Sequence, residues 1–469
     1  MSGGILINCG LVPIILNRFT TKVSLTVCIV ATMNISVIGQ GKIGLPLSVA
    51  ILQNNTSNKV VGIDVNADLI NKLTKGHFTH VIEEGFELKF NECIQEKRLD
   101  FALDYSSISA AQVIVVAVPL KIDRLNIPDY QNLESAFRGI GENLSEGSLV
   151  ILETTVPVGL CRRKLIPIIE EYSGLISGKD FSFVFSPERI SSGSFFHDLS
   201  KYPKLIGPLD FRSGVLAKEF YSSFLLTSDV TQVSPELRIL SSIETTEFVK
   251  LAESIYRDVN IGLANLLSHD CTQAGIDYFE VKKSANTQSF SHLHSPGIYV
   301  GGHCIPVYPH LYEASFPENP FLALIKSARS VNNQIHKSII DTVIQETEGT
   351  ETKIETCIIM GAAYRGNVKE IFDSGVFPLR DYLNNMGIEC LVYDPLFNNA
   401  ELSEYGLNPT EKTNCNSELV IINSDHSDFL NLKSNDFSPK AVIIDGRNIL
   451  NPANFRPKQL FTIGIGWNK

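Results

Sequence analysis

The segment MNISVIGQGKIGLPLSVAILQ, residues 33–53, decides the fold of this chain. A short β-branched strand leads into Gly39, Gly41 and Gly44, which form the pattern G-x-G-x-x-G, and an amphipathic helix follows. In this pattern the first glycine permits a tight turn, the second lets backbone N–H groups approach a pyrophosphate, and the third lets the helix pack on the strand. The phosphate then lies at the helix N-terminus, where unpaired N–H groups and the helix dipole favour negative charge.

The next apolar strand, KVVGIDV, contains Asp64, twenty residues after Gly44. A carboxylate at this place accepts hydrogen bonds from the adenosine ribose hydroxyls and repels a 2′-phosphate, which predicts NAD and not NADP as the cofactor. The alternative is a structural glycine turn in another kind of α/β protein. The expected cofactor-binding residues are Gly39, Gly41, Lys42, Ile43, Gly44, Asp64, Pro119 and Thr155.

Three more apolar runs, Gln112–Pro119, Ser148–Pro157 and Phe181–Glu188, alternate with helical patterns and predict a parallel sheet buried on both faces. Each run ends in polar residues or proline, at the edge where open α/β sheets bind ligands. Thr155 and Glu188 are therefore expected to face the cofactor. Taken alone, Thr155 would be read as a helix cap and Glu188 as a solvated loop carboxylate.

Residues 241–275 show helical spacing of apolar side chains, with Ser241 and Glu244 fitting a capping box and Gly275 a stop. So long a helix suits a connector between domains and a dimer interface. An internal repeat begins at Thr352. There a strand, a glycine turn, a helix and a second strand ending in Asp394 occur in the same order as in the segment that begins at Met33. Because this second turn lacks the full G-x-G-x-x-G, we expect it to bind something other than a dinucleotide.

The predicted fold class is therefore α/β, with two Rossmann-like parallel-sheet domains joined by a long central helix. The predicted division of the chain is an N-terminal extension (1–32), an NAD-binding domain (33–230), a central helical dimerisation domain that carries the cysteine loop (231–348), and a second Rossmann-like domain (349–469).

GGHCIPVYP, residues 301–309, places Cys304 between a glycine pair and Pro306. Glycines let the backbone bend sharply and approach a ligand, and proline fixes the exit from the turn. A thiol presented in this way suggests covalent catalysis through a thiohemiacetal or thioester. The alternative is a small apolar core residue, which most free cysteines are. Lys250, on the long helix, is by pattern alone a solvated side chain.

The 469 residues are 44% hydrophobic and 19% charged, which describes an ordinary globular protein, and the net charge of −11 argues against nucleic acid as a partner. Nine scattered cysteines without paired Cys/His spacing indicate reduced thiols in the cytoplasm and no metal site. Arg18 and Lys22 interrupt the apolar N-terminus, so we expect no membrane span. We interpret residues 1–32 as a dispensable extension or a misassigned start; the alternative is a targeting segment.

From residue 33 onward the chain resembles the UDP-sugar dehydrogenases of the UDP-glucose/GDP-mannose dehydrogenase family. The motifs that carry the resemblance are GQGKIGLPLS, ETTVPVG, FSPERISSG, KLAESIYRDVNIGLAN, HSPGIYVGGHCIPV, ARSVNN and DGRN. RDVN with GGHCIPV looks like the branch that acts on UDP-N-acetylglucosamine or UDP-N-acetylmannosamine.

The resemblance implies oxidation of the sugar C6 alcohol to a carboxylate with two NAD⁺, supplying a uronic acid for polysaccharide synthesis. It implies Cys304 as the nucleophile, Lys250 as the cation that stabilises oxyanion charge, Glu188 in thioester hydrolysis, and Thr155 near the reacting carbon. The expected substrate-binding residues are Glu188, Arg189, Lys250, Asn260, Gly301, Arg365 and Arg447. The expected partners are a UDP-sugar and a second copy of the chain, in a homodimer or a higher homo-oligomer.

The chain departs from the family pattern at three places. Tyr308 stands where the family has an aspartate, Ser254 where it has an asparagine, and Tyr364-Arg365 with Glu370 and Phe372 where it has F-K and a later D-x-R. Two alternatives follow from these departures: a catalytically impaired nucleotide-sugar-binding paralogue, and a dehydrogenase that stops after two electrons or at the thioester.

Overall fold

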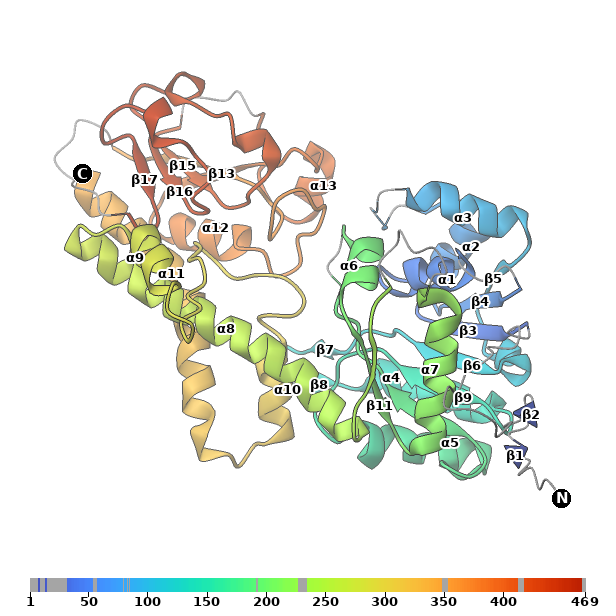
Figure 1. Ribbon diagram of the computed structural model, residues 1–469. Coiled ribbons are helices and arrows are strands. Elements are labelled where there is room, and N and C mark those ends of the chain that lie inside the picture. The colour runs from blue at the N-terminus through green and yellow to red at the C-terminus, as the bar shows by residue number, and fades with distance from the viewer. Residues whose placement is uncertain are drawn as a thin grey trace, which may run out of the picture. The chain divides into compact units, whose positions relative to one another are not determined.

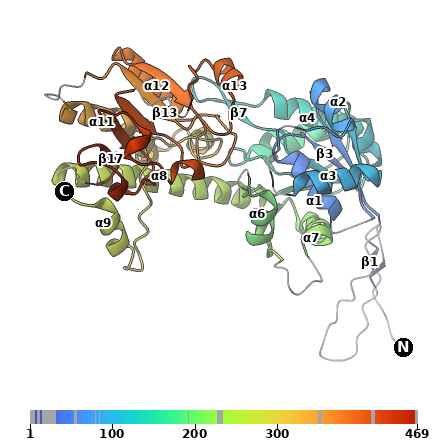
Figure 2. The same cartoon turned by 90° about the horizontal axis from the view of Figure 1, so that it is seen from above.

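The computed structural model (Figures 1 and 2) describes residues 32–465 apart from 54–56, 79, 82, 84, 191–192, 227–233, 348–352 and 412–416. Before them it describes only two short antiparallel strands, β1 (Ile7–Asn8) and β2 (Pro13–Ile14). The interpretation of residues 1–32 thus lies almost wholly outside the described residues. The predicted boundaries at 230/231 and 348/349 also fall in undescribed segments and stay predictions.

The chain divides into two compact units, residues 1–121 with 129–248, and residues 122–128 with 249–469. The sheet of the first unit has eight strands in the order β12-β11-β10-β9-β6-β3-β4-β5. Its strands are β3 (Asn34–Ile38), β4 (Lys59–Ile63), β5 (Leu99–Ala102), β6 (Val113–Val116), β9 (Leu149–Leu152), β10 (Ser182–Phe185), β11 (Lys204–Pro208) and β12 (Leu237–Ile239). Two further short strands, β7 (Lys121–Ile122) and β8 (Pro128–Asp129), pair with each other.

The sheet of the first unit is parallel over six strands, as the apolar runs predict. Strands β6, β9 and β10 are buried along their whole length, because helices cover both faces. The difference from the prediction is at one edge, where β11 pairs antiparallel with β10 and β12 extends β11. Neither of these two strands is among the predicted ones.

The helices of the first unit are α1 (Gly44–Gln53), α2 (Ala67–Thr74), α3 (Phe86–Gln95), α4 (Gln131–Asn143), α5 (Ile166–Ser173), α6 (Phe195–Lys201) and α7 (Phe211–Leu225). Apolar residues of α1, α3 and α7 form one buried cluster with side chains of the sheet, and those of α4 and α5 form another. The cores therefore lie on the two faces of the sheet (Figure 1).

The predicted long helix is α8 (Ile243–Ala274), unbroken over 32 residues (Figures 1 and 2). The predicted cap was wrong by one residue: Ser242 Oγ, not Ser241, accepts from Thr245 N at 3.1 Å. Gly275 ends the helix with a φ of +70°, as predicted. No helix among the described residues is long and apolar enough to cross a membrane.

The second unit contains a five-stranded, wholly parallel sheet in the order β14-β13-β15-β16-β17. Its strands are β13 (Thr356–Met360), β14 (Glu389–Tyr393), β15 (Leu419–Ile422), β16 (Val442–Asp445) and β17 (Leu460–Thr462). Its other helices are α9 (Tyr278–Ala285), α10 (Tyr308–Ser315), α11 (Ala323–Thr347), α12 (Val376–Asn385) and α13 (Asn399–Glu404). The predicted fold class is thus confirmed.

A buried ion pair joins α8 to α11 within the second unit. Arg329 Nη1 lies 2.7 Å from Asp258 Oδ1, and Asn332 Nδ2 donates to the same oxygen at 2.8 Å. Gly262 lets the helices approach, because a Cβ there would lie 3.0 Å from Ala328 O. These contacts fix α8 and α11, the helices before and after the segment that carries the cysteine loop.

We expect Arg329→Met to destabilise the protein by about 3–5 kcal/mol, because it leaves the Asp258 carboxylate buried without its counter-charge. The measurement is urea unfolding followed by circular dichroism. Arg238→Met is the matched control, since Arg238 pairs with Glu236 on the surface and such pairs contribute little. An unfolding midpoint in Arg329→Met as high as in the control would contradict a structural role for the buried pair.

Candidate active site

The glycine turn after β3 has the geometry that a dinucleotide site needs. Gly39 has a φ of +91° and its N–H donates to Ile63 O at 2.8 Å. A Cβ on Gly44 would lie 1.7 Å from Gly39 O, so helix and turn are in contact there. A Cβ on Gly41 would meet nothing within 4 Å. The first and third glycines are therefore in close contact with neighbouring backbone, whereas the space beside the second glycine is empty. A pyrophosphate can approach the backbone at this second glycine.

Asp64 lies directly against this turn. Its Oδ2 accepts from Gln40 N at 2.8 Å, and its Oδ1 accepts from Asn66 N at 2.9 Å. Lys42 and Pro119 are exposed, on the turn and after β6 respectively. Of the predicted cofactor residues, the structure thus gathers the turn glycines and Asp64, and their roles toward NAD stay predictions.

Glu188 belongs to a buried charged cluster in the first unit. Its carboxylate forms an ion pair with Lys204 Nζ, which also lies 2.8 Å from Glu153 Oε1. Tyr221 donates its hydroxyl to that Glu153 oxygen at 2.8 Å. Burial raises the pKa of Glu153 to about 7, against the opposing effect of Lys204.

Sequence reasoning did not single out Glu153 or Lys204. Glu153 opens the ETTVPVG motif, two residues before the buried Thr155, and Lys204 begins a strand that the analysis did not name. The sequence signal that could have found Lys204 is its place directly before a short apolar run, which is typical of the start of a strand. Arg189, the next predicted residue, donates Nη1 to Pro203 O at 3.2 Å, so its guanidinium is held by the segment that leads to Lys204.

Cys304 lies just before α10, in the second unit. Its thiol donates to the Tyr308 hydroxyl at 3.4 Å, and its carbonyl accepts from Tyr308 N at 2.9 Å. Lys250 Nζ, on α8, lies 5.6 Å from the centroid of the Tyr308 ring. The structure therefore brings together the predicted nucleophile, the predicted cation and the residue that departs from the family pattern.

Ser254, the second departure, has its hydroxyl engaged within α8, where it donates to Lys250 O at 3.4 Å. Asn260 Nδ2 likewise donates to Tyr256 O, one turn earlier, at 2.7 Å. The structure thus records helix contacts for both side chains, and the substrate role of Asn260 stays a prediction.

His303, the neighbour of Cys304, packs on the third group of departures. Its ring stacks on Phe372 with centroids 4.1 Å apart and planes 13° apart. Its Nε2 lies 3.4 Å from Glu370 Oε2. Both partners follow the second glycine turn, so this segment holds the cysteine loop.

The glycine pair fits tightly against the same segment. A Cβ on Gly301 would lie 2.1 Å from Asp373 O. Gly302 has a φ of +97°, and a Cβ on it would lie 3.0 Å from the Tyr364 ring. The positions therefore require glycine for close approach, and for Gly302 also for its backbone conformation.

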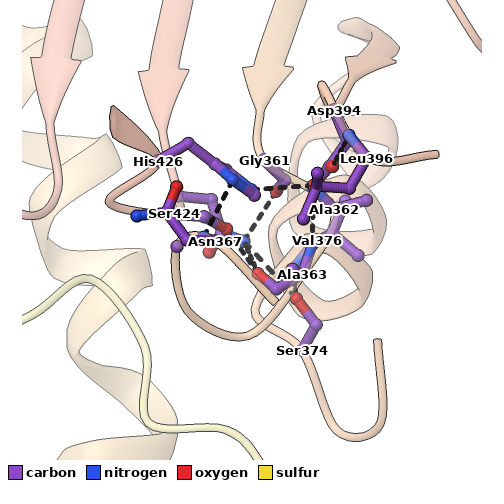
Figure 3. Close-up of polar contacts among 12 residues, drawn as sticks. Gly361, Ala362, Ala363, Asn367, Ser374, Val376, Asp394, Leu396, Ser424 and His426 are labelled. Carbon is purple, nitrogen blue, oxygen red and sulfur yellow. Dashed lines mark hydrogen bonds and ion pairs between the residues drawn. The ribbon is translucent and has the colours of Figure 1, made fainter. Parts of the chain in front are cut away.

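The second glycine turn differs from the first in where its amides point (Figure 3). Asp394 Oδ2 accepts from Ala362 N at 2.7 Å and from Ala363 N at 3.1 Å. Gly361 has a φ of +99°, and a Cβ on it would lie 2.4 Å from Ser424. Because a carboxylate already binds these two amides, the turn does not present them to a phosphate.

His426 completes this network (Figure 3). Its Nδ1 accepts from Asn367 N at 3.1 Å, so the proton of the neutral ring is on Nε2, which lies 3.1 Å from Asp394 Oδ2. Burial opposes the charge of Asp394, but the hydrogen bonds it accepts outweigh burial and lower its pKa.

Arg447 lies at the carboxyl end of β16 in the same unit. Its Nε donates to Asn423 O at 2.5 Å and its Nη2 to Tyr364 O at 3.2 Å, and burial lowers its pKa. Arg365 follows Tyr364 and lies 5.9 Å from the centroid of that ring. Arg447 thus contacts the backbone of Tyr364 and Arg365 lies near its ring, and their role toward a UDP group stays a prediction.

Comparison with known protein families gives three matches along the chain. The NAD binding domain of the UDP-glucose/GDP-mannose dehydrogenase family matches residues 33–225, its central domain matches residues 244–334, and its UDP binding domain matches residues 358–452.

Curated relatives agree with these matches. The UDP-N-acetyl-D-mannosamine dehydrogenase of Pyrococcus horikoshii is 32% identical over 429 residues, covering 89% of this chain and 96% of the relative. The UDP-N-acetyl-D-glucosamine 6-dehydrogenase of Pseudomonas aeruginosa is 28% identical over 407 residues, covering 85% and 92%.

Solved structures show the same likeness. The structure of a UDP-D-ManNAc dehydrogenase from Pyrococcus horikoshii superposes with a TM-score of 0.80 at 28% identity, over 93% of this chain and 100% of that one. The UDP-N-acetyl-mannosamine dehydrogenase Cap5O from Staphylococcus aureus also gives 0.80 at 28% identity, over 93% and 99%.

Two glycine substitutions separate folding from cofactor binding. We expect Gly41→Ala to fold normally and to weaken NAD binding by about tenfold or more, because its methyl group points into the space expected for the pyrophosphate. Gly44→Ala should instead lower the unfolding midpoint, because its methyl group would clash with the Gly39 carbonyl. The measurements are NAD titration by calorimetry and urea unfolding. Unchanged NAD affinity in folded Gly41→Ala would show that the pyrophosphate does not approach Gly41.

Proposed function

This chain belongs to the UDP-glucose/GDP-mannose dehydrogenase family of NAD-dependent nucleotide-sugar dehydrogenases, and we propose that it oxidises the C6 hydroxyl of a UDP-N-acetylhexosamine to the carboxylate. The proposed substrates are UDP-N-acetylglucosamine and UDP-N-acetylmannosamine, the sugars in the names of the relatives. The observation that carries the proposal is that the predicted nucleophile Cys304 and the predicted cation Lys250 lie close together, both beside the Tyr308 ring.

The first glycine turn, with Gly39, Gly41 and Gly44, would hold NAD⁺, which would supply the hydride acceptor for the sugar C6 carbon in each of the two oxidations. After the first oxidation, Cys304 Sγ bonds to the aldehyde carbon, and the thiol proton passes to the carbonyl oxygen, which gives a thiohemiacetal. Lys250 stabilises the negative charge that develops on this oxygen. Oxidation of the adduct gives a thioester.

Hydrolysis of the thioester restores the thiol. A water oxygen bonds to the acyl carbon, the carbon–sulfur bond breaks, and the sulfur regains a proton. We propose Glu188 as the group that accepts a proton from the water, and Thr155 as a neighbour of the reacting carbon. In this proposal Arg189, Asn260, Gly301, Arg365 and Arg447 bind the nucleotide sugar.

We further propose that the enzyme works as a homodimer or a higher homo-oligomer in the cytoplasm. On α8, Tyr256, Leu263 and Leu266 are 51%, 40% and 47% exposed, an apolar stripe that a second copy would cover. The mechanism needs Cys304 as a free thiol, and thiols stay reduced in the cytoplasm. The uronic acid product suits polysaccharide synthesis.

Specific observations favour a second candidate, a dehydrogenase that stalls at the thioester. Neither Tyr308 nor Ser254 supplies the carboxylate or amide of the family pattern, and Lys204 binds the Glu188 carboxylate. Intact-mass spectrometry during turnover distinguishes the candidates, because a stalled enzyme accumulates a sugar adduct on Cys304. Tight UDP-sugar binding without any NADH formation would instead indicate a binding paralogue.

We expect two NADH for each UDP-N-acetylhexosamine consumed by the native enzyme, and at most one in Cys304→Ala or Cys304→Ser, because the second oxidation needs the sulfur adduct. The measurement is NADH absorbance with a panel of UDP-sugars. Cys271→Ala is the control, since Cys271 is a half-buried thiol on α8 that the proposed mechanism does not use. Normal turnover by Cys304→Ala would refute the covalent mechanism.

We expect Tyr308→Phe to slow the alkylation of Cys304 by iodoacetamide by about tenfold or more. Once Cys304 ionises, the phenol donates to the thiolate, and a hydrogen bond to a charged group contributes about 1.5–3 kcal/mol. The measurement is peptide mapping over time, with Tyr312→Phe on the same helix as the control. Equal alkylation rates in Tyr308→Phe and the native enzyme would show that the hydroxyl does not support the thiolate.

A further inference from the structure

Lys204, Glu153 and Glu188 form a charged cluster that is almost fully buried, so the charge of each group affects the protonation of the others. The exposed fractions of the side chains are 6% for Lys204, 1% for Glu153 and 9% for Glu188. The two carboxyl groups follow the ends of β9 and β10, and the lysine begins β11. One ammonium therefore serves two carboxyl groups that lie on neighbouring strand ends.

The charges do not balance when all three groups are ionised, because two carboxylates face one ammonium. An uncompensated buried charge is costly, so the cluster favours keeping one proton on a carboxyl group. Glu153 is the more deeply buried of the two. The groups that face it are Glu188 after β10, Lys204 on β11 and Tyr221 on α7.

The hydrogen bonds show where that proton would lie. Glu153 Oε1 accepts from both Lys204 Nζ and the Tyr221 hydroxyl. Glu153 Oε2 is buried and has no hydrogen-bond partner among the described residues. A proton on Oε2 leaves both contacts of Oε1 intact, so Oε2 is the oxygen that can carry the proton without breaking a hydrogen bond of the cluster.

We propose that Glu153 and Lys204 are positioning residues for Glu188, and that the proton on Glu153 decides whether Lys204 neutralises Glu188 alone or is shared by two carboxylates. The inference rests on the proposed role of Glu188 in thioester hydrolysis. With Glu153 protonated, the ammonium holds the Glu188 carboxylate. With Glu153 ionised, two carboxylates share the one ammonium, so its hold on the Glu188 carboxylate weakens and that carboxylate is more available to a water molecule.

The direction of the pH dependence follows from the raised pKa of Glu153, about 7 in place of the ordinary 4.5. Between these two values the folded protein keeps a proton that the unfolded chain loses, so this group lowers the free energy of unfolding as pH rises. Thioester hydrolysis should change in the opposite sense, increasing as pH rises through about 7.

The first measurement needs no activity. Infrared titration of the full-length protein without substrate should show the carbonyl stretch of a protonated carboxylic acid that disappears as pH rises through about 7. Glu153→Gln should abolish this band, and Lys204→Met should move its loss to higher pH, because the ammonium favours the ionised carboxyl. Glu134→Gln, which breaks the Lys164 ion pair on α4, is the control and should leave the band unchanged.

The second measurement follows the Cys304 thioester by rapid quenching and intact-mass spectrometry. In the native enzyme its decay should accelerate as pH rises towards about 7, as Glu153 loses its proton. In Glu153→Gln the decay should change less than about twofold over the same range, because the titrating proton is gone.

The outcomes separate this inference from the proposed function. Absence of a carboxyl band that depends on Glu153 would overturn the inference. An unchanged pH profile of thioester decay in Glu153→Gln would also overturn it, and would leave the dehydrogenase function intact. Absence of any NADH or Cys304 adduct in the native enzyme would overturn the proposed function, while the infrared result would still decide the protonation of Glu153.

Discussion

In both units, the aspartate after the second strand accepts hydrogen bonds from the glycine turn after the first. Asp64 binds one amide of the first turn, and Asp394 binds two amides of the second. These bonds fix each turn at the carboxyl end of its sheet, the edge where ligands bind. The difference between one amide and two decides what each turn offers. The first stays open at Gly41, and the second is closed by a carboxylate and His426.

The closed second turn leads into the segment that supports the nucleophile. Tyr364, Glu370, Phe372 and Asp373 follow this turn, and all four lie against residues 301–303. At the level of sequence, Glu370 and Phe372 count only as departures from a family pattern. In the fold they hold His303, next to Cys304. The departures therefore belong to the same structural unit as the nucleophile, because Phe372 and Glu370 contact the residue next to it.

The sequence was sufficient to predict elements that rest on local patterns. Apolar runs predicted β6, β9 and β10, and the glycine spacing predicted the turn against which Asp64 lies. The sequence was insufficient to predict the surroundings of a residue whose partners lie far away along the chain. Lys204 reads as a surface lysine because lysine is seldom buried, and only the fold shows the two carboxyl groups that permit its burial. Tyr308 likewise reads as turn filler until its hydroxyl is seen beside the Cys304 thiol.

The predicted nucleophile Cys304 and the predicted base Glu188 have hydrogen-bond partners of different kinds. Around Cys304 the hydrogen-bond partner is the phenol of Tyr308, which accepts from the thiol and brings no carboxylate to the site. Around Glu188 the partner is an ammonium shared with a second carboxyl group that titrates near neutrality. If the carboxylate expected near the cysteine is replaced by a phenol, the base for hydrolysis has to come from elsewhere. Because Lys204 is shared, the state of Glu188 as the base would then depend on the proton of Glu153. That proton would influence the hydrolysis of the thioester, and it would not influence the attack of the Cys304 sulfur on the aldehyde.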